Sequence, residues 1–78
     1  MIGHVVNLNV ERGFFFLRVE NEKEQSTTDY FAHRSDLRGV RVRALKEGDA
    51  LDFIPQDTDR GPRATQIWPA FVEETADA

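Results

Sequence analysis

The stretch Arg12-Gly13-Phe14-Phe15-Phe16-Leu17 (RGFFFL, residues 12–17) holds three of the six phenylalanines in this chain of 78 residues. Successive side chains of a β-strand point to opposite faces, so Phe14 and Phe16 share one face while Phe15 and Leu17 share the other. Only one of these faces can point into a core. Either assignment leaves aromatic rings on the outer surface, unless long loops or a dimer contact bury all three.

Outside this stretch, short apolar runs alternate with Gly, Pro, Asp and Ser, which indicates short strands and no long amphipathic helix. Five strands are predicted, at residues 3–10, 13–19, 29–34, 50–54 and 63–68. Because proline cannot donate to a sheet ladder, Pro55 is expected to end the fourth strand.

The connections are predicted from their polar and turn-forming residues. We expect a tight turn at residues 11–13, solvated polar loops at 20–28 and 56–61, a short helical turn at 35–37 and a turn at 46–49. Residues 38–45 alternate Arg and Val, which permits a strand, but a long loop is the favoured interpretation.

Five short strands without a crossover helix predict an all-β, five-stranded antiparallel domain spanning residues 1–69. Curling the sheet into a partly open barrel removes exposed strand edges. Trp68 is expected to pack in the core or at an edge, and Phe71 to lie against the barrel end or be exposed. Residues 70–78 are interpreted as an acidic tail.

The composition suits a folded domain, with 40% hydrophobic and 31% charged residues. The lack of cysteine excludes disulfides and thiolate metal sites and fits a reducing cytoplasm. No apolar run approaches membrane-spanning length, and the N-terminus has no signal-like core, so we expect a cytoplasmic protein without a membrane partner. No catalytic motif or metal-ligand spacing is present, which predicts neither an enzyme nor a cofactor.

The net charge of −4 alone argues against a nucleic-acid partner. Its distribution weakens that argument, because three acids lie in the tail and others gather at residues 20–24. Eight of the cations are arginines, whose planar fork stacks on bases and binds phosphate. Those flanking the later strands are Arg38, Arg41, Arg43, Arg60 and Arg63. Each alone is typical of a solvated surface, but together beside an aromatic face they suit phosphate contact.

A second aromatic stretch, Asp29-Tyr30-Phe31-Ala32-His33-Arg34 (DYFAHR), places Phe31 and His33 on one strand face. Beside Phe14 and Phe16, these side chains would form a continuous aromatic platform. Such platforms bind single-stranded nucleic acids, because every base has a π-face that can stack.

Four segments, in order, make the chain resemble the bacterial cold-shock proteins. Residues 3–17 (GHVVNLNVERGFFFL) are similar to the family's opening with its Lys/Arg-Gly-Phe-Gly-Phe motif, and residues 29–35 (DYFAHRS) to its Val-Phe-Val-His-Phe motif. Residues 45–51 (LKEGDAL) resemble Leu-x-Glu-Gly-x-x-Val, and residues 61–64 (GPRA), with Ile67, the closing Gly-Pro-x-Ala strand.

The resemblance implies a barrel of the OB type that stacks bases on the outer face of its first three strands. By position it implies that Phe14, Phe16, Phe31 and His33 are stacking residues, with Arg12 as a phosphate or base contact. Arg34 and Arg63 complete the expected site. The inward side chains would then be Phe15, Leu17, Val5 and Tyr30.

Three departures from the family pattern bear on affinity. Asn7 and Leu8 stand where the family usually has Trp-Phe, and Arg34 stands where it commonly has Phe. Each lost base stack is worth roughly 1–3 kcal/mol, although the Arg34 guanidinium can itself stack. Phe15 replaces a usual glycine and requires repacking nearby.

The expected function is binding of single-stranded RNA or DNA, as an RNA chaperone or a regulator of transcription or translation. The alternative is a protein-interaction or self-associating module that uses the same platform, with weakened nucleic-acid binding. The expected oligomeric state is a monomer or a weak homodimer.

Overall fold

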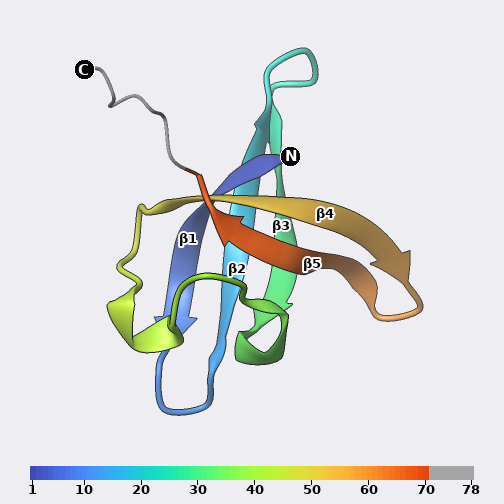
Figure 1. The fold of residues 1–78 in the computed structure, drawn as a ribbon. Helices are drawn as coiled ribbons and strands as arrows, with labels where there is room; N and C mark the ends of the chain where they lie inside the picture. Colours follow the sequence, from blue (N-terminus) through green and yellow to red (C-terminus); the bar gives the residue numbers. More distant parts are fainter. Residues whose placement is uncertain (71–78) are drawn as a thin grey trace.

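A computed structural model of the chain describes residues 1–70. Its elements are the strands β1 (Ile2–Asn9), β2 (Phe14–Asn21), β3 (Ser26–His33), β4 (Ala50–Thr58) and β5 (Gly61–Pro69), with two short 3-10 helices, η1 (Arg34–Asp36) and η2 (Val42–Ala44) (Figure 1). The predictions for Phe71 and for the rest of the tail lie outside the described residues.

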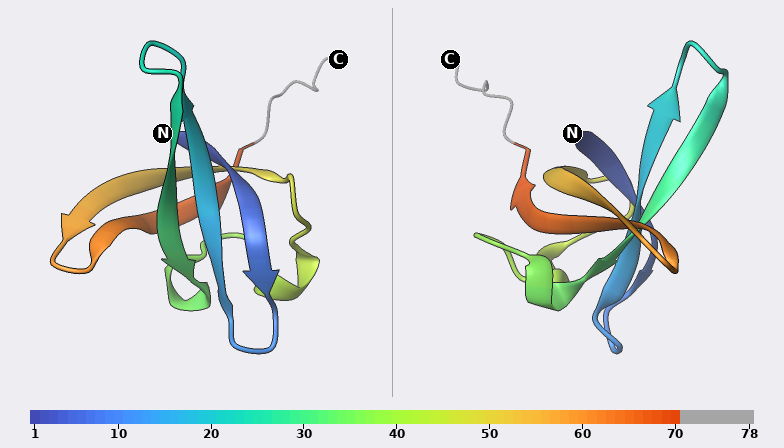
Figure 2. Two further views of the ribbon diagram at one scale, coloured as in Figure 1. Left: turned by 180° about the vertical axis from the view of Figure 1, so that it is seen from behind. Right: turned by 90° about the vertical axis from the view of Figure 1, so that its right-hand side faces the viewer.

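The strands form a closed barrel in the order β1-β2-β3-β5-β4. Neighbouring strands are antiparallel except β3 and β5, which run parallel and meet at a single residue pair, Phe31 and Arg63. The two hairpins β2–β3 and β4–β5 extend beyond the barrel in different directions (Figure 2). The predicted all-β, five-stranded barrel is therefore confirmed.

The alternating burial along β2 decides which of its faces is the core. Phe15 and Leu17 are fully buried, and their cross-strand partners on β3 are Ala32 and Tyr30. The Tyr30 ring lies 5.1 Å from that of Phe53. The buried side chains of the core are Val5, Phe15, Leu17, Ala32, Leu45, Leu51, Phe53, Ala64 and Ile67.

The polar loop predicted at residues 20–28 is mostly strand. β2 and β3 stay paired up to Asn21 opposite Ser26, and only residues 22–25 form the turn. The Asn21 side-chain amide donates to the Thr28 hydroxyl at 3.0 Å. Strands that extend outside the barrel need no apolar face. The polar composition of these residues therefore did not indicate that they form strands.

The predicted end of the fourth strand at Pro55 is also wrong. β4 continues to Thr58, with Pro55 opposite Ala64 on β5. β1 pairs with β4 only at residues 50–52, so beyond Asp52 the second edge of β4 is free of β1. A proline is tolerated at such an edge, and most of the predicted loop at residues 56–61 becomes hairpin strand.

Residues 38–45 form a loop containing η2, as the favoured interpretation predicted. Trp68 differs from expectation: its side chain is 53% exposed on β5. It lies beside Gly39 of that loop, where an added Cβ would be 3.5 Å from the indole ring. Within residues 1–70, no helix has the length and apolar character needed to cross a bilayer.

Candidate nucleic-acid interface

Four aromatic side chains form one outer face of the barrel, which we call the aromatic face: Phe14, Phe16, Phe31 and His33. The β2–β3 register places Phe14 opposite His33 and Phe16 opposite Phe31. The Phe31 ring lies 5.6 Å from Phe16, edge-on, and 6.1 Å from Phe14, stacked. Phe31 is 37% exposed, so this face offers ring surface to a ligand.

The His33 ring is held by Ser35 at the start of η1. Its Nδ1 accepts the Ser35 backbone N–H at 3.1 Å and lies 2.9 Å from the Ser35 hydroxyl. Accepting an N–H requires a lone pair on Nδ1, so the neutral ring carries its proton on Nε2. His33 therefore presents an aromatic ring and one hydrogen-bond donor on this face.

Arg12 and Arg34 lie beside the β1–β2 turn, at one end of the aromatic face. The Arg12 backbone N–H donates to Asn9 Oδ1 at 3.0 Å, which ties the turn. The Arg34 N–H donates to the carbonyl oxygen of Gly13 at 2.7 Å. Both arginines are exposed to solvent.

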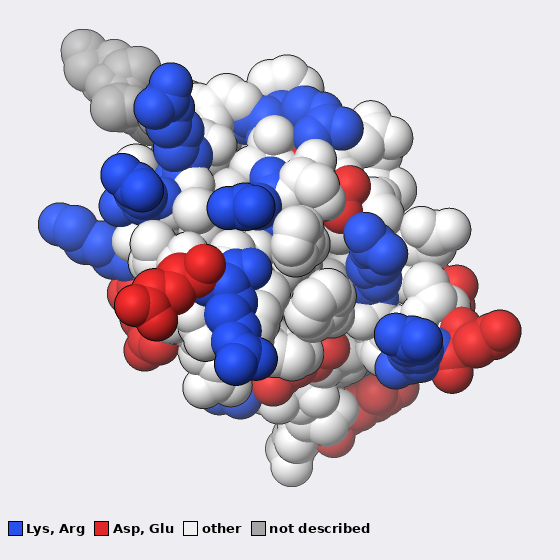
Figure 3. All heavy atoms as spheres, turned by 90° about the horizontal axis from the view of Figure 1, so that it is seen from below, with Lys and Arg blue, Asp and Glu red and all other residues white. Residues whose placement is uncertain are grey.

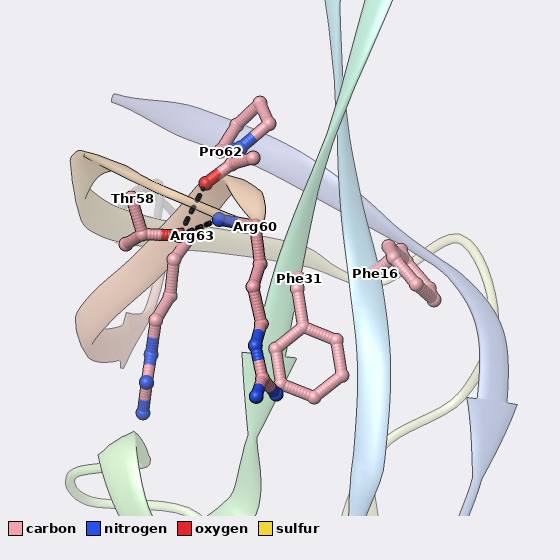
Figure 4. A pocket seen from close by; sticks show the side chains of 7 residues that line it. Phe16, Phe31, Thr58, Arg60, Pro62 and Arg63 are labelled. Atoms are coloured by element: carbon pink, nitrogen blue, oxygen red, sulfur yellow. Dashed lines mark hydrogen bonds between the residues drawn. The ribbon is translucent and has the colours of Figure 1, made fainter.

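A groove of about 340 Å³ separates the aromatic face from the β4–β5 hairpin. Phe16 and Phe31 line one side, and Thr58 with residues 60–63 line the other (Figure 4). The Thr58 hydroxyl donates to the Gly61 carbonyl at 2.8 Å and accepts the Arg60 N–H at 3.2 Å. This capping of the hairpin turn sets the position from which Arg60 reaches down beside Phe31.

Arg63 is anchored at the other end of the same groove. Its Nη2 donates to Asp36 Oδ2 of η1 at 3.1 Å. Its Nε is buried and has no hydrogen-bond partner within residues 1–70. The Arg63 guanidinium is thus fixed toward η1, and Arg60 is the arginine whose side chain runs beside the Phe31 ring (Figure 4).

The charges of the described residues are segregated along the barrel. Residues 34–46 carry five cations and one acid, and that acid, Asp36, is bonded to Arg63. Lysine and arginine side chains spread over the end of the barrel that holds these loops (Figure 3). The barrel is therefore locally positive there despite the negative total.

An ion pair borders the aromatic face at its opposite end. Arg18 and Asp29 are cross-strand partners, one alternation beyond Phe16 and Phe31, with Nε and Oδ1 2.8 Å apart. The hydrogen bond from Arg18 lowers the pKa of Asp29, and the same contact raises the pKa of Arg18. Arg18 is thus engaged within the protein.

The structure brings the predicted site residues into one region: the aromatic face, Arg63 across the groove, and Arg12 and Arg34 at the turn end. Sequence reasoning missed Thr58, Pro62 and Val6, the last of which lies opposite Phe16. Thr58 is distant in sequence from Phe31 and belongs to no motif, so nothing in the sequence marked it. Within residues 1–70, no cluster of three or more His, Asp or Glu side chains could hold a metal ion.

Comparisons with known proteins agree with this geometry. The 'Cold-shock' DNA-binding domain family matches residues 1–70. The chain is 37% identical over 65 residues to cold shock protein CspA of Staphylococcus aureus, covering 83% of this chain and 91% of the relative. Its identity to the protein of the same name from Staphylococcus saprophyticus is 35% over the same length, with the same coverage. The chain belongs to the cold-shock domain family.

Proposed function

We propose that this protein binds single-stranded RNA or DNA by stacking bases on the aromatic face while the surrounding arginines contact phosphates. Membership of the cold-shock domain family supports nucleic-acid binding in general. The observation that carries the finer proposal is the groove that exposed Phe31 lines together with Arg60 and the anchored Arg63. A ring and a fixed guanidinium match the two parts of one nucleotide, its base and its phosphate.

Two departures from the family pattern shift the balance from stacking toward electrostatics. Asn7 is exposed and offers no ring, and Arg34 stands where the family commonly has Phe. The cations of residues 34–46 compensate by neutralising phosphates. Binding is therefore expected to weaken steeply with salt, because each neutralised phosphate releases condensed counterions.

The role we propose is binding without catalysis, by a cytoplasmic protein that acts as an RNA chaperone or a regulator of transcription or translation. A strand held flat on exposed rings is kept from pairing with its complement. That property would melt or protect weak RNA structure.

Fluorescence anisotropy of labelled pyrimidine oligonucleotides, as DNA and as RNA, tests the proposal at low and moderate salt. Phe31→Ala is expected to weaken binding about 10-fold or more, the equivalent of losing one base stack. Ile54→Ala, an exposed position on another face, is the matched control. Saturable, salt-sensitive binding that Phe31→Ala weakens by about 10-fold or more would support the proposal, and a folded protein that binds nothing at low salt would refute it.

A further inference from the structure

The most exposed large apolar side chains among residues 1–70 lie off the aromatic face. Ile2, Trp68, Met1 and Ile54 are 55, 53, 51 and 50% exposed, compared with 37% for Phe31. Exposed single residues are common on proteins, but Ile2, Trp68 and Ile54 belong to one surface.

The strand register places them together. Ile2 on β1 and Trp68 on β5 are both cross-strand partners of Asp52 on β4, so the three residues form a row on one face. Ile54 follows Asp52 on the same side of β4, since Leu51 and Phe53 point into the core. We call Ile2, Ile54 and Trp68 the second face, which spans the sheet where β4 lies between β1 and β5 (Figure 1).

The charges within the second face neutralise each other. The N-terminal ammonium of Met1 donates to Asp52 Oδ1 at 3.1 Å and to the Phe53 carbonyl at 3.0 Å. A partner therefore needs to supply neither a cation nor an anion.

We propose that the second face is where two copies of this chain associate. In a two-fold symmetric dimer the second faces of both copies meet each other. No unpaired charge is buried between them, because each Asp52 is paired with the Met1 ammonium of its own chain. Half of each of three large side chains supplies roughly 300 Å² of apolar surface per copy, within the size range of functional patches. That is well under the roughly 800 Å² per partner of a stable interface, so the dimer is weak and transient.

Salt distinguishes this association from nucleic-acid binding. Each copy carries a net charge of −4, so two copies repel each other and added salt screens the repulsion. A rise in sodium chloride should therefore strengthen self-association and weaken oligonucleotide binding.

Sedimentation of the full chain over about a hundredfold range of concentration, at low and high sodium chloride, tests the proposal. The expected result is an average mass that rises with concentration from one chain toward two, more so at high salt. Ile54→Gln and Trp68→Ala should abolish the rise. Val10→Gln, a substitution at an exposed apolar residue of the β1–β2 turn, should preserve it.

Trp68 also reports on its own environment, since it is the sole tryptophan. Its emission should shift to shorter wavelength as the concentration of protein rises, and should not respond to an oligonucleotide added to dilute protein. A strict monomer at every concentration and salt would overturn the proposal, as would association that survives Ile54→Gln and Trp68→Ala. Quenching of dilute protein by the oligonucleotide would assign the second face to nucleic acid instead.

Discussion

The side chain of Arg34 lies across Gly13, in the space that any other residue at position 13 would fill. A Cβ added to Gly13 would be 2.6 Å from the Arg34 Cδ, and Gly13 has a φ of +74°. The backbone bond from the Arg34 N–H to the Gly13 carbonyl, 2.7 Å long, holds the two residues together. The glycine of the RGF motif thus serves both the turn and the placement of an arginine.

Gly13→Ala is expected to lower the free energy of unfolding by about 1–2 kcal/mol, the cost of a left-handed conformation for an L-residue. It should also displace Arg34 and weaken oligonucleotide binding. Urea unfolding measures the first effect and anisotropy the second. In an Arg34→Ala background the stability loss should persist while the further loss of binding disappears; an unchanged further loss would contradict the placement of Arg34.

Phe15 and Phe16 are neighbours in sequence with opposite roles. Phe15→Ala empties the core and should cost about 3–5 kcal/mol, enough to unfold a domain of this size in large part. Phe16→Ala removes a partly buried ring of the aromatic face and should leave the fold intact while weakening oligonucleotide binding about 10-fold. Circular dichroism during urea unfolding, paired with anisotropy, checks both. If Phe16→Ala proved as destabilising as Phe15→Ala, the assignment of faces would be wrong.

The Arg18–Asp29 pair predicts a pH dependence of stability. Because Arg18 lowers the pKa of Asp29 below its usual 3.8, the contribution of the pair is fully present above that value and is lost as the pH falls through the folded-state pKa. Arg18→Gln should therefore be less stable than the parent at neutral pH and match it in strong acid. Urea midpoints across this range measure the difference, and a gap that stays constant into acid would refute the explanation.

The contact between His33 and Ser35 predicts the tautomer of a ring on the aromatic face. Two-bond and three-bond ¹⁵N–¹H correlations should find the proton of neutral His33 on Nε2. Ser35→Ala removes the hydroxyl but keeps the backbone N–H, so the tautomer should persist. His33→Gln, which keeps a side-chain donor, should retain more oligonucleotide binding than His33→Ala. A proton on Nδ1 would contradict the geometry of the η1 cap.

The sequence alone left open which face of the Phe14–Phe16 run points inward. Strand alternation defined the two faces, and the family resemblance implied the one that the structure confirms, with Phe15, Leu17, Val5 and Tyr30 inward. Phe15 lies fully buried opposite Ala32, which stands where the cold-shock motif has a valine.

The sequence failed where pairing rather than burial makes a strand. The Glu20–Asn21 and Ser26–Thr28 segments are polar and contain no buried residue, yet their backbones pair across the hairpin. The strand beyond Pro55 is exposed in the same way. Hydrophobic periodicity does not detect strands that have no apolar face. Thr58 belongs to such a strand, so its place in the groove was not predicted either. The contact between Trp68 and Gly39 joins segments far apart in the sequence, so no local pattern predicts the environment of the indole.

β3 and β5 are paired at a single residue pair, Phe31 and Arg63, which makes this the shortest strand pairing in the barrel. Both residues also line the groove. A strand of nucleic acid that contacts both Phe31 and Arg63 connects β3 to β5 from outside the barrel. We expect a bound oligonucleotide to stabilise this pairing and to slow amide hydrogen exchange along β3 and β5 more than along the distant part of β1. The proposed ligand site is thus also the place where a bound strand would keep the barrel closed.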